Sequence, residues 1–165
     1  MKKAILLVVL AALAWWYFDG SRRLSEEAIR EHYREQLEAT ASFDTERLCA
    51  AMAEDYRAND VSHGPQGQQK LTMDKAQACD SLSQSLGMFK QLSDASGGKF
   101  LLDIAYEIKS ITISADKKSA SVDGLSTFKL GDRLVARTRG TDRLIRRNGT
   151  ILSQGGDTKT WMYGL

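Results

Sequence analysis

The chain has 165 residues, with 23 basic and 21 acidic side chains, so its formal net charge is +2. A balance this close to zero argues against a nucleic-acid-binding protein and against an acidic scaffold. A single proline and a charged fraction of 27% argue against a long disordered segment, and the length suits one domain with its own core.

The N-terminus has the composition of a membrane anchor. Residues 4–18 (AILLVVLAALAWWYF) follow two lysines and carry no charge and no helix breaker, and the aromatic side chains at their end suit the lipid headgroup level. The run is shorter than the ~20 residues that a bilayer core requires. A signal peptide cleaved after A-L-A at 12–14 is the alternative, but cleavage there would leave a very short apolar region. We therefore predict a retained signal anchor over 1–23 and an exported domain over 24–165.

Three helices are predicted after the leader. The first begins at Ser25, a suitable N-cap that two glutamates follow, and the second begins at Asp44. The segment 59–70 (NDVSHGPQGQQK) contains the only proline and several amides, so we expect an exposed loop there. Thr72 is the expected cap of the third helix, which ends in a glycine-containing segment at 93–99.

The rest of the chain is predicted to form strands joined by tight turns. Residues 100–113 (FLLDIAYEIKSITI) alternate apolar and polar until the phase reverses near Lys109, which indicates a strand bent by a β-bulge. Turns are expected at 115–118, 131–132 and 148–149, and four main strands result. The predicted fold class is α+β: an N-terminal membrane anchor helix, then three helices packed on a strongly curved antiparallel sheet in a cone-like arrangement.

This order of elements resembles that of the nuclear transport factor 2-like superfamily, which also contains ketosteroid isomerase. The resemblance covers about residues 25–163 and rests on the helix order, the long bent strand and the turn SADKKSASV at 114–122. It implies a cone with a pocket between the curved sheet and the helices. Members include isomerases and dehydratases as well as binding and assembly modules, so the resemblance does not select a function.

The only cysteines, Cys49 and Cys79, lie on the predicted buried faces of two helices. Because an exported domain is oxidised, we predict a disulfide between them, and two inert buried thiols are the alternative. Their spacing without clustered histidines does not fit a zinc site, and we expect no metal or other cofactor. The two histidines, His32 and His63, are expected at the surface.

An isomerase in such a cone would need an acidic base and hydroxyl donors that converge on an apolar pocket. The alternation in 100–113 points Tyr106 inward and Asp103 outward, and Asp142 shares the phase of the apolar residues in its strand. No catalytic residue is assigned, because aromatic side chains that fill a core are the simpler interpretation. The candidate pocket residues are Tyr33, Tyr56, Tyr106, Asp142 and Trp161.

Arg137, Arg139 and Arg143 share one face of a predicted strand and form a basic stripe. A solvated outer sheet face, with cross-strand pairing to acids, is the simpler interpretation of the stripe, and contact with anionic headgroups, an acidic polymer or a protein partner is the alternative.

The leading functional hypothesis is a membrane-anchored periplasmic binding or assembly module without catalytic activity. The alternative is a small-molecule isomerase or dehydratase with a pocket in the cone. We expect a single-pass protein of the bacterial inner membrane, held through residues 4–18, with its C-terminal domain in the periplasm. The expected partner is a protein or a small apolar ligand, and a homodimer formed through the sheet is a further alternative.

Overall fold

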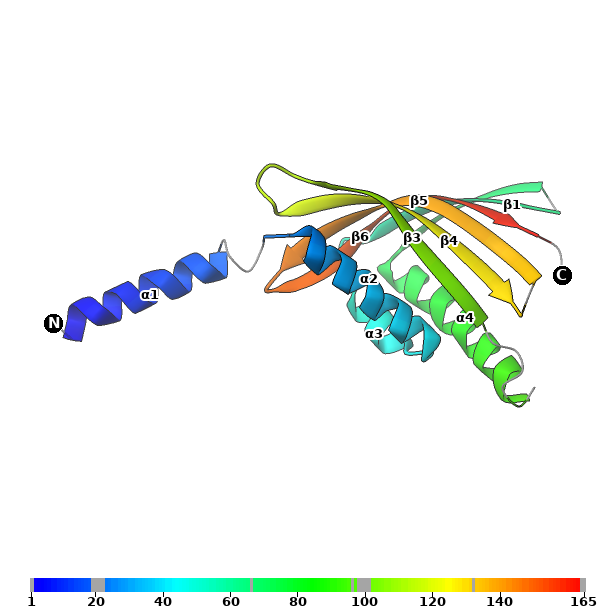
Figure 1. Cartoon of the computed structure of the whole chain (residues 1–165), viewed down its shortest axis with the longest axis horizontal. Helices are drawn as coiled ribbons and strands as arrows, with labels where there is room; N and C mark the ends of the chain where they lie inside the picture. The colour runs from blue at the N-terminus through cyan, green and yellow to red at the C-terminus, as the bar shows by residue number, and fades with distance from the viewer. Residues whose placement is uncertain are drawn as a thin grey trace.

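One curved sheet organises the domain, and three helices cover one of its faces (Figure 1). The computed structural model describes residues 2–18, 23–65, 67–95, 97, 102–131 and 133–163. The helices are α1 (Lys2–Phe18), α2 (Glu26–Ala41), α3 (Thr45–Ala50) and α4 (Lys75–Ala95). The strands are β1 (Arg57–Gly64), β2 (Gly67–Asp74), β3 (Leu102–Ile113), β4 (Ser119–Leu130), β5 (Arg133–Arg147) and β6 (Thr150–Met162).

The N-terminal apolar run forms α1, which lies away from the rest of the chain (Figure 1). From Ile5 to Leu10 its aliphatic side chains are between 49% and 69% exposed. Among the residues that the structure describes, no helix combines the length and the apolar character needed to cross a membrane. The segment predicted to anchor the chain thus forms a helix of 17 residues that exposes the aliphatic side chains of Ile5 to Leu10.

The predicted caps begin two of the three domain helices. Ser25 accepts a hydrogen bond from the backbone of α2 at 3.3 Å, and Asp44 accepts one from the backbone of α3 at 3.0 Å. The cap predicted at Thr72 is wrong, because α4 begins after Asp74. There, Asp74 accepts from the Gln77 N–H at 3.0 Å and the Gln77 side chain accepts from the Asp74 N–H at 3.1 Å, which makes a reciprocal capping box.

The sheet has six strands in the order β2-β1-β6-β5-β4-β3, instead of the four that were predicted. It is mixed, not wholly antiparallel as expected, because β1 pairs with β6 in parallel. The two additional strands, β1 and β2, form a hairpin from the segment predicted as an exposed loop over 59–70. Most of that hairpin is polar on both faces, so it lacks the alternation that marks a half-buried strand, and the pairing with β6 holds it in place.

The predicted bend in the long strand is confirmed. The register of β3 against β4 shifts between Ile108 and Ser110, where the alternation reverses. Tyr106 is half-buried and Asp103 is exposed, as the alternation predicted. The turn at 148–149 is also confirmed, since Asn148 and Gly149 both have positive φ, as a tight hairpin turn requires.

The core lies between α2 and the middle of the sheet. A second, smaller cluster of Ala39, Leu48 and Leu86 joins the three domain helices. His32 on α2 was expected at the surface but is only 8% exposed, and burial lowers its pKa to about 4, so it is neutral at physiological pH. The main cluster contains Leu24, Ile29, Ala120, Val122, Leu144 and Ile151.

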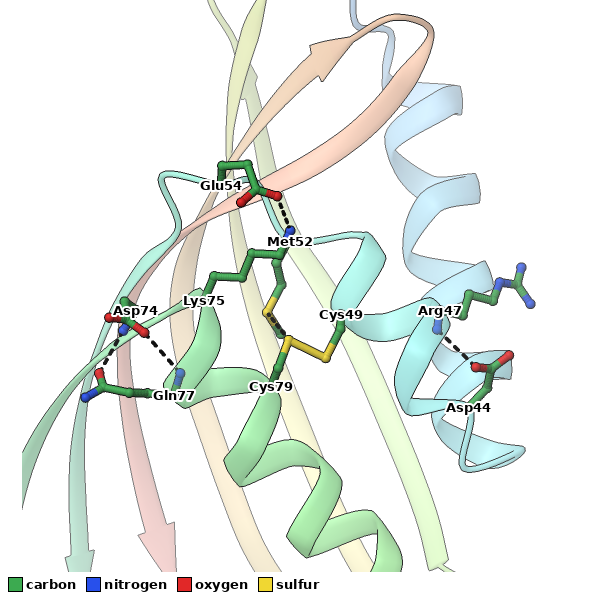
Figure 2. The surroundings of a disulfide bond; sticks show 9 residues. All are labelled: Asp44, Arg47, Cys49, Met52, Glu54, Asp74, Lys75, Gln77 and Cys79. Atoms are coloured by element: carbon green, nitrogen blue, oxygen red, sulfur yellow. Dashed lines mark hydrogen bonds and ion pairs between the residues drawn. A yellow bond between two sulfur atoms is a disulfide. The ribbon is translucent and has the colours of Figure 1, made fainter.

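A disulfide joins α3 to α4, as predicted (Figure 2). Cys49 and Cys79 are separated by 30 residues in the sequence, and their Cα atoms lie 5.6 Å apart. Figure 2 also shows Met52 beside the bond, with its sulfur 3.8 Å from that of Cys79. The disulfide fixes the short helix α3, which has only six residues, against a longer one.

Replacing both cysteines, as Cys49→Ala with Cys79→Ala, should lower the free energy of unfolding by ~3–4 kcal/mol, because the unfolded chain loses a cross-link that closes a loop of about thirty residues. Guanidinium denaturation of the full-length chain in detergent measures the difference. Reductant should destabilise the natural chain and leave the double variant unchanged. Equal midpoints for the two oxidised proteins would contradict a stabilising disulfide.

Candidate functional site

A carboxyl group faces the space between the helices and the sheet. It belongs to Asp142, which lies on β5 opposite Gly156 of β6. The β5–β6 register shifts between Asp142 and Leu144, so β6 carries an extra residue there. Gly155 has a φ of 81° at this bulge, and a Cβ on it would overlap the backbone of Arg57, so only glycine fits. A bulge of this kind bends the strand and reorients its side chains beside a pocket.

The carboxyl of Asp142 accepts two hydrogen bonds. The hydroxyl of Tyr33, on α2, donates to Oδ2 at 2.9 Å, and the hydroxyl of Ser153, on β6, donates to Oδ1 at 2.6 Å. The backbone N–H of Gly155 in turn donates to Ser153 Oγ at 2.9 Å, which orients the serine. The bulge therefore positions both the carboxyl and one of its donors.

Two further tyrosines complete the wall of this space. The ring of Tyr106, on β3, stacks on that of Tyr33 with centroids 4.8 Å apart and an interplanar angle of 18°. Its hydroxyl reaches β4 at Gly124, where a Cβ would overlap it. Tyr56, which directly precedes β1, also lines this space and contributes a third phenol.

The result is a cavity of ≈ 200 Å³, which we call the inner cavity. Apart from the three tyrosines and Asp142, its walls are made of small residues, so backbone and short hydroxyl side chains surround the carboxyl. These small residues are Ala58, Gly124, Ser126, Thr138, Gly140, Thr141, Ser153, Gly155, Gly156 and Thr158.

The surroundings shift the ionisation of this group. Burial raises the pKa of the Asp142 carboxyl above its usual value, and the hydrogen bonds from Ser153 and Tyr33 oppose part of that rise. Burial and the neighbouring charge of Asp142 raise the pKa of Tyr33 and of Tyr56, and burial likewise raises that of Tyr106. The phenols are therefore protonated donors at neutral pH, and Asp142 is the group able to accept or release a proton.

The fold brings four of the five candidate pocket residues together: Tyr33, Tyr56, Tyr106 and Asp142 all line the inner cavity. Trp161 does not, because its side chain lies on the outer face of β6. Ser153 was missed by the sequence analysis, and its only signal was the Gly155-Gly156 pair that follows it.

The basic stripe lies on the outer face of β5, where Arg137, Arg139 and Arg143 are exposed. Arg143 donates through Nε to the Gly155 carbonyl at 3.5 Å. Within the described part of the chain, no group of histidine, cysteine, aspartate and glutamate side chains is arranged to hold a metal ion.

No protein-family model and no curated protein matches the sequence. Similarity appears at the level of structure. A nuclear transport factor 2-like protein of unknown function from Pseudomonas putida has 17% identity and a TM-score of 0.55, with 81% of this chain and 84% of that chain covered. A scytalone dehydratase-like protein from Novosphingobium aromaticivorans has 15% identity and a TM-score of 0.54, with 84% and 87% covered.

A second nuclear transport factor 2-like protein of unknown function, from Shewanella oneidensis, has 14% identity and a TM-score of 0.54, with 81% of this chain and 97% of that chain covered. At these identities the similarity concerns the fold. The chain has the nuclear transport factor 2-like fold, as the order of its elements predicted.

Tyr33→Phe should raise the pKa of Asp142 further, because the carboxylate loses a donor that favours its charged form. A group whose pKa is raised in the folded state stabilises the fold below its unfolded pKa and loses that contribution as the pH rises through the folded value. The variant should therefore lose more stability at pH 7 than at pH 4, by about 1–3 kcal/mol.

Carbon NMR titration of the Asp142 carboxyl and unfolding measurements across pH 4–7 test this expectation. Tyr56→Phe is the matched control, since it removes a hydroxyl from the same cavity but not one that donates to Asp142. In an Asp142→Asn background the pH dependence of the Tyr33→Phe effect should vanish. A Tyr33→Phe effect that is independent of pH in both backgrounds would mean that the hydroxyl does not stabilise a carboxylate.

Proposed function

We propose that this chain, with its nuclear transport factor 2-like fold, binds a small molecule in the inner cavity and transfers a proton on it through Asp142, as an isomerase or dehydratase does. One observation carries the proposal: a partly buried carboxyl with a raised pKa faces a cavity and is held by Tyr33 and Ser153. A base of this kind, tuned by burial and fixed by neighbours, suits proton abstraction from carbon.

The other lining residues suit the same reaction. As a carboxylate, Asp142 would remove a proton from a carbon next to a carbonyl, or from the carbon adjacent to one that bears a hydroxyl, so that the C–H electron pair forms a double bond as the C–O bond breaks. Tyr56 and Tyr106 carry protonated hydroxyls that would donate to the oxygen where negative charge develops. Return of the proton to a different carbon completes an isomerisation, whereas its transfer to a departing hydroxide completes a dehydration and yields water.

A second function, ligand binding without chemistry, is favoured by two other observations. Both oxygens of Asp142 already accept hydrogen bonds, so a substrate would compete with Tyr33 or Ser153 for the carboxyl. The inner cavity of ≈ 200 Å³ is also smaller than the ~300–1,000 Å³ of most small-molecule sites. Under either function, a cavity of this volume admits only a small ligand.

A deuterium-exchange experiment distinguishes proton transfer from ligand binding without chemistry. Small cyclic ketones, incubated with the full-length chain in heavy water, should exchange protons beside the carbonyl, and the rate should fall by about 10²–10⁴-fold in Asp142→Asn. Asp123→Asn is the matched control, because that aspartate lies on the outer face of β4, outside the inner cavity. Ketones that raise the melting temperature without any exchange would support the binding module, and neither exchange nor binding would contradict both functions.

We also propose that α1 holds the domain at a bacterial inner membrane, as a single-pass protein with residues 24–165 in the periplasm. The aliphatic side chains exposed from Ile5 to Leu10 support insertion into lipid, and the Cys49–Cys79 disulfide suits an oxidising compartment. At ~1.5 Å per residue α1 is about 25 Å long, so a bilayer core of ~30 Å would thin locally around it.

An alkaline phosphatase reporter fused to the C-terminus should be active in cells, and the fusion should stay with membranes in alkaline carbonate. Leu7→Lys with Val8→Lys should release the fusion, because a charge within a bilayer core costs ~2.5–3.5 kcal/mol. Arg30→Lys on α2 serves as a control outside α1. A reporter active only in the cytoplasm would contradict the proposed location.

A further inference from the structure

The outer face of the sheet, away from the helices, carries a second and larger cavity. We call it the outer cavity. It has a volume of ≈ 570 Å³ and is lined by Lys109, Leu125, Arg137, Arg139, Trp161 and Tyr163. On β5, Arg137 and Arg139 alternate with Thr138 and Gly140, which line the inner cavity. The two cavities thus occupy opposite faces of the same strands and share no lining residue.

Strand register places cations beside an aromatic ring. Arg137 pairs directly with Trp161, and Arg139 pairs with Lys159 on the same strand and with Leu125 on the other side. Trp161 also stacks with His63 of β1, with ring centroids 6.1 Å apart and an interplanar angle of 15°. The indole is therefore supported from one side, and the basic side chains lie on the other.

Three of the four cations in and beside the outer cavity form no ion pair within the described part of the chain. Arg137, Arg139 and Lys159 are unpaired there, while Lys109 pairs with Glu107 at 2.6 Å.

The acids nearest to them along the strands are held by uncharged donors. Asp123 accepts from Thr141 at 2.5 Å and from Ser110 at 2.7 Å, and Asp157 accepts from Asn59 at 2.9 Å. The hydrogen bonds to Asp123 lower its pKa, and the charge of Arg139 adds to that effect, so Arg139 is partly balanced by this carboxylate. Arg137 and Lys159 leave positive charge available in a concave surface that also contains apolar rings.

We propose that the outer cavity binds a small organic anion, a carboxylate attached to an aromatic or aliphatic body. Arginine guanidinium groups pair with carboxylates through two parallel hydrogen bonds, and Trp161, Tyr163 and Leu125 offer contact to the apolar body. An uncharged apolar ligand would cover the arginines without pairing them, and an inorganic anion would leave the rings exposed. The volume of ≈ 570 Å³ is within the ~300–1,000 Å³ range of small-molecule sites.

A second copy of the chain fits this surface less well. A two-fold contact centred on the outer cavity would place Arg137, Arg139 and Lys159 opposite the same residues of the other copy. Like charges in contact across an interface cost several kcal/mol unless an anion separates them. Charge complementarity therefore favours the carboxylate.

The test uses the full-length, nitrogen-15-labelled chain in nanodiscs of zwitterionic phosphatidylcholine, which present no anionic lipid. Two probes share one ring system: 2-naphthoate carries a carboxylate, and 2-naphthylmethanol is uncharged. The indole N–H signal of Trp161, identified by its loss in Trp161→Phe, should shift saturably with 2-naphthoate only. Arg137→Gln with Arg139→Gln should weaken binding about tenfold or more, as expected for lost charge-assisted hydrogen bonds.

Arg143→Gln is the matched control, because Arg143 lies on the same face of β5 but does not line the outer cavity. It should leave the affinity within about twofold. Equal responses to the two probes, or equal weakening by Arg143→Gln, would overturn the proposal. So would a Trp161 signal that changes with protein concentration alone, which would identify a second copy as the occupant. Should the double variant not fold, the single variants Arg137→Gln and Arg139→Gln provide the same comparison.

Discussion

A carboxyl group beneath a helix needs hydrogen-bond donors, and this requirement ties together segments of the chain that are far apart in sequence. Asp142 on β5 receives one donor from α2, through Tyr33, and one from β6, through Ser153. An unpaired buried polar group costs about 1–3 kcal/mol, so α2 and the sheet are held in one relative position by more than apolar contact. Between them the inner cavity keeps hydroxyl groups and glycine backbone, where a tightly packed core would place aliphatic side chains. That composition leaves a cavity of ≈ 200 Å³ beside the carboxyl.

Because side chains alternate along β5, the two faces of the sheet carry different kinds of residue: polar groups sheltered from water on one face and exposed cations on the other. Side chains at Thr138 and Asp142 face the helices and lie among phenols, so their polar atoms are sheltered from water. Their neighbours Arg137 and Arg139 face outward, where water solvates the guanidinium groups and no desolvation free energy is lost. A strand at the middle of the sheet can therefore serve both faces, because each residue contributes to only one of them.

Local signals predicted most of the fold, and contacts between distant segments account for what was missed. The bulge after Ile108, the inward direction of Tyr106 and the turn at Asn148 each depend on a few neighbouring residues, and all three were predicted from the sequence. The β1–β2 hairpin was missed because its polar residues show no period, and its partner β6 lies about a hundred residues away. For the candidate site, the alternation of residues along the strand predicted that Asp142 points inward. The role of Ser153 was not predictable, because its hydroxyl is turned toward the carboxyl only by a bulge in the folded sheet.

The parallel pairing of β1 with β6 also governs the order in which the domain is able to fold. Asn59 pairs with Asp157 and His63 with Trp161, so the sheet joins an early strand to the last one. Contacts of such separation are costly in loop-closure entropy and slow the folding of a chain. During synthesis, the β1–β2 hairpin has no further strand to pair with until β6 appears, although β3, β4 and β5 are able to pair as they emerge. The sheet is therefore complete only when its C-terminal strand arrives, and truncation before Asp157 would remove every residue of β6 that pairs with β1.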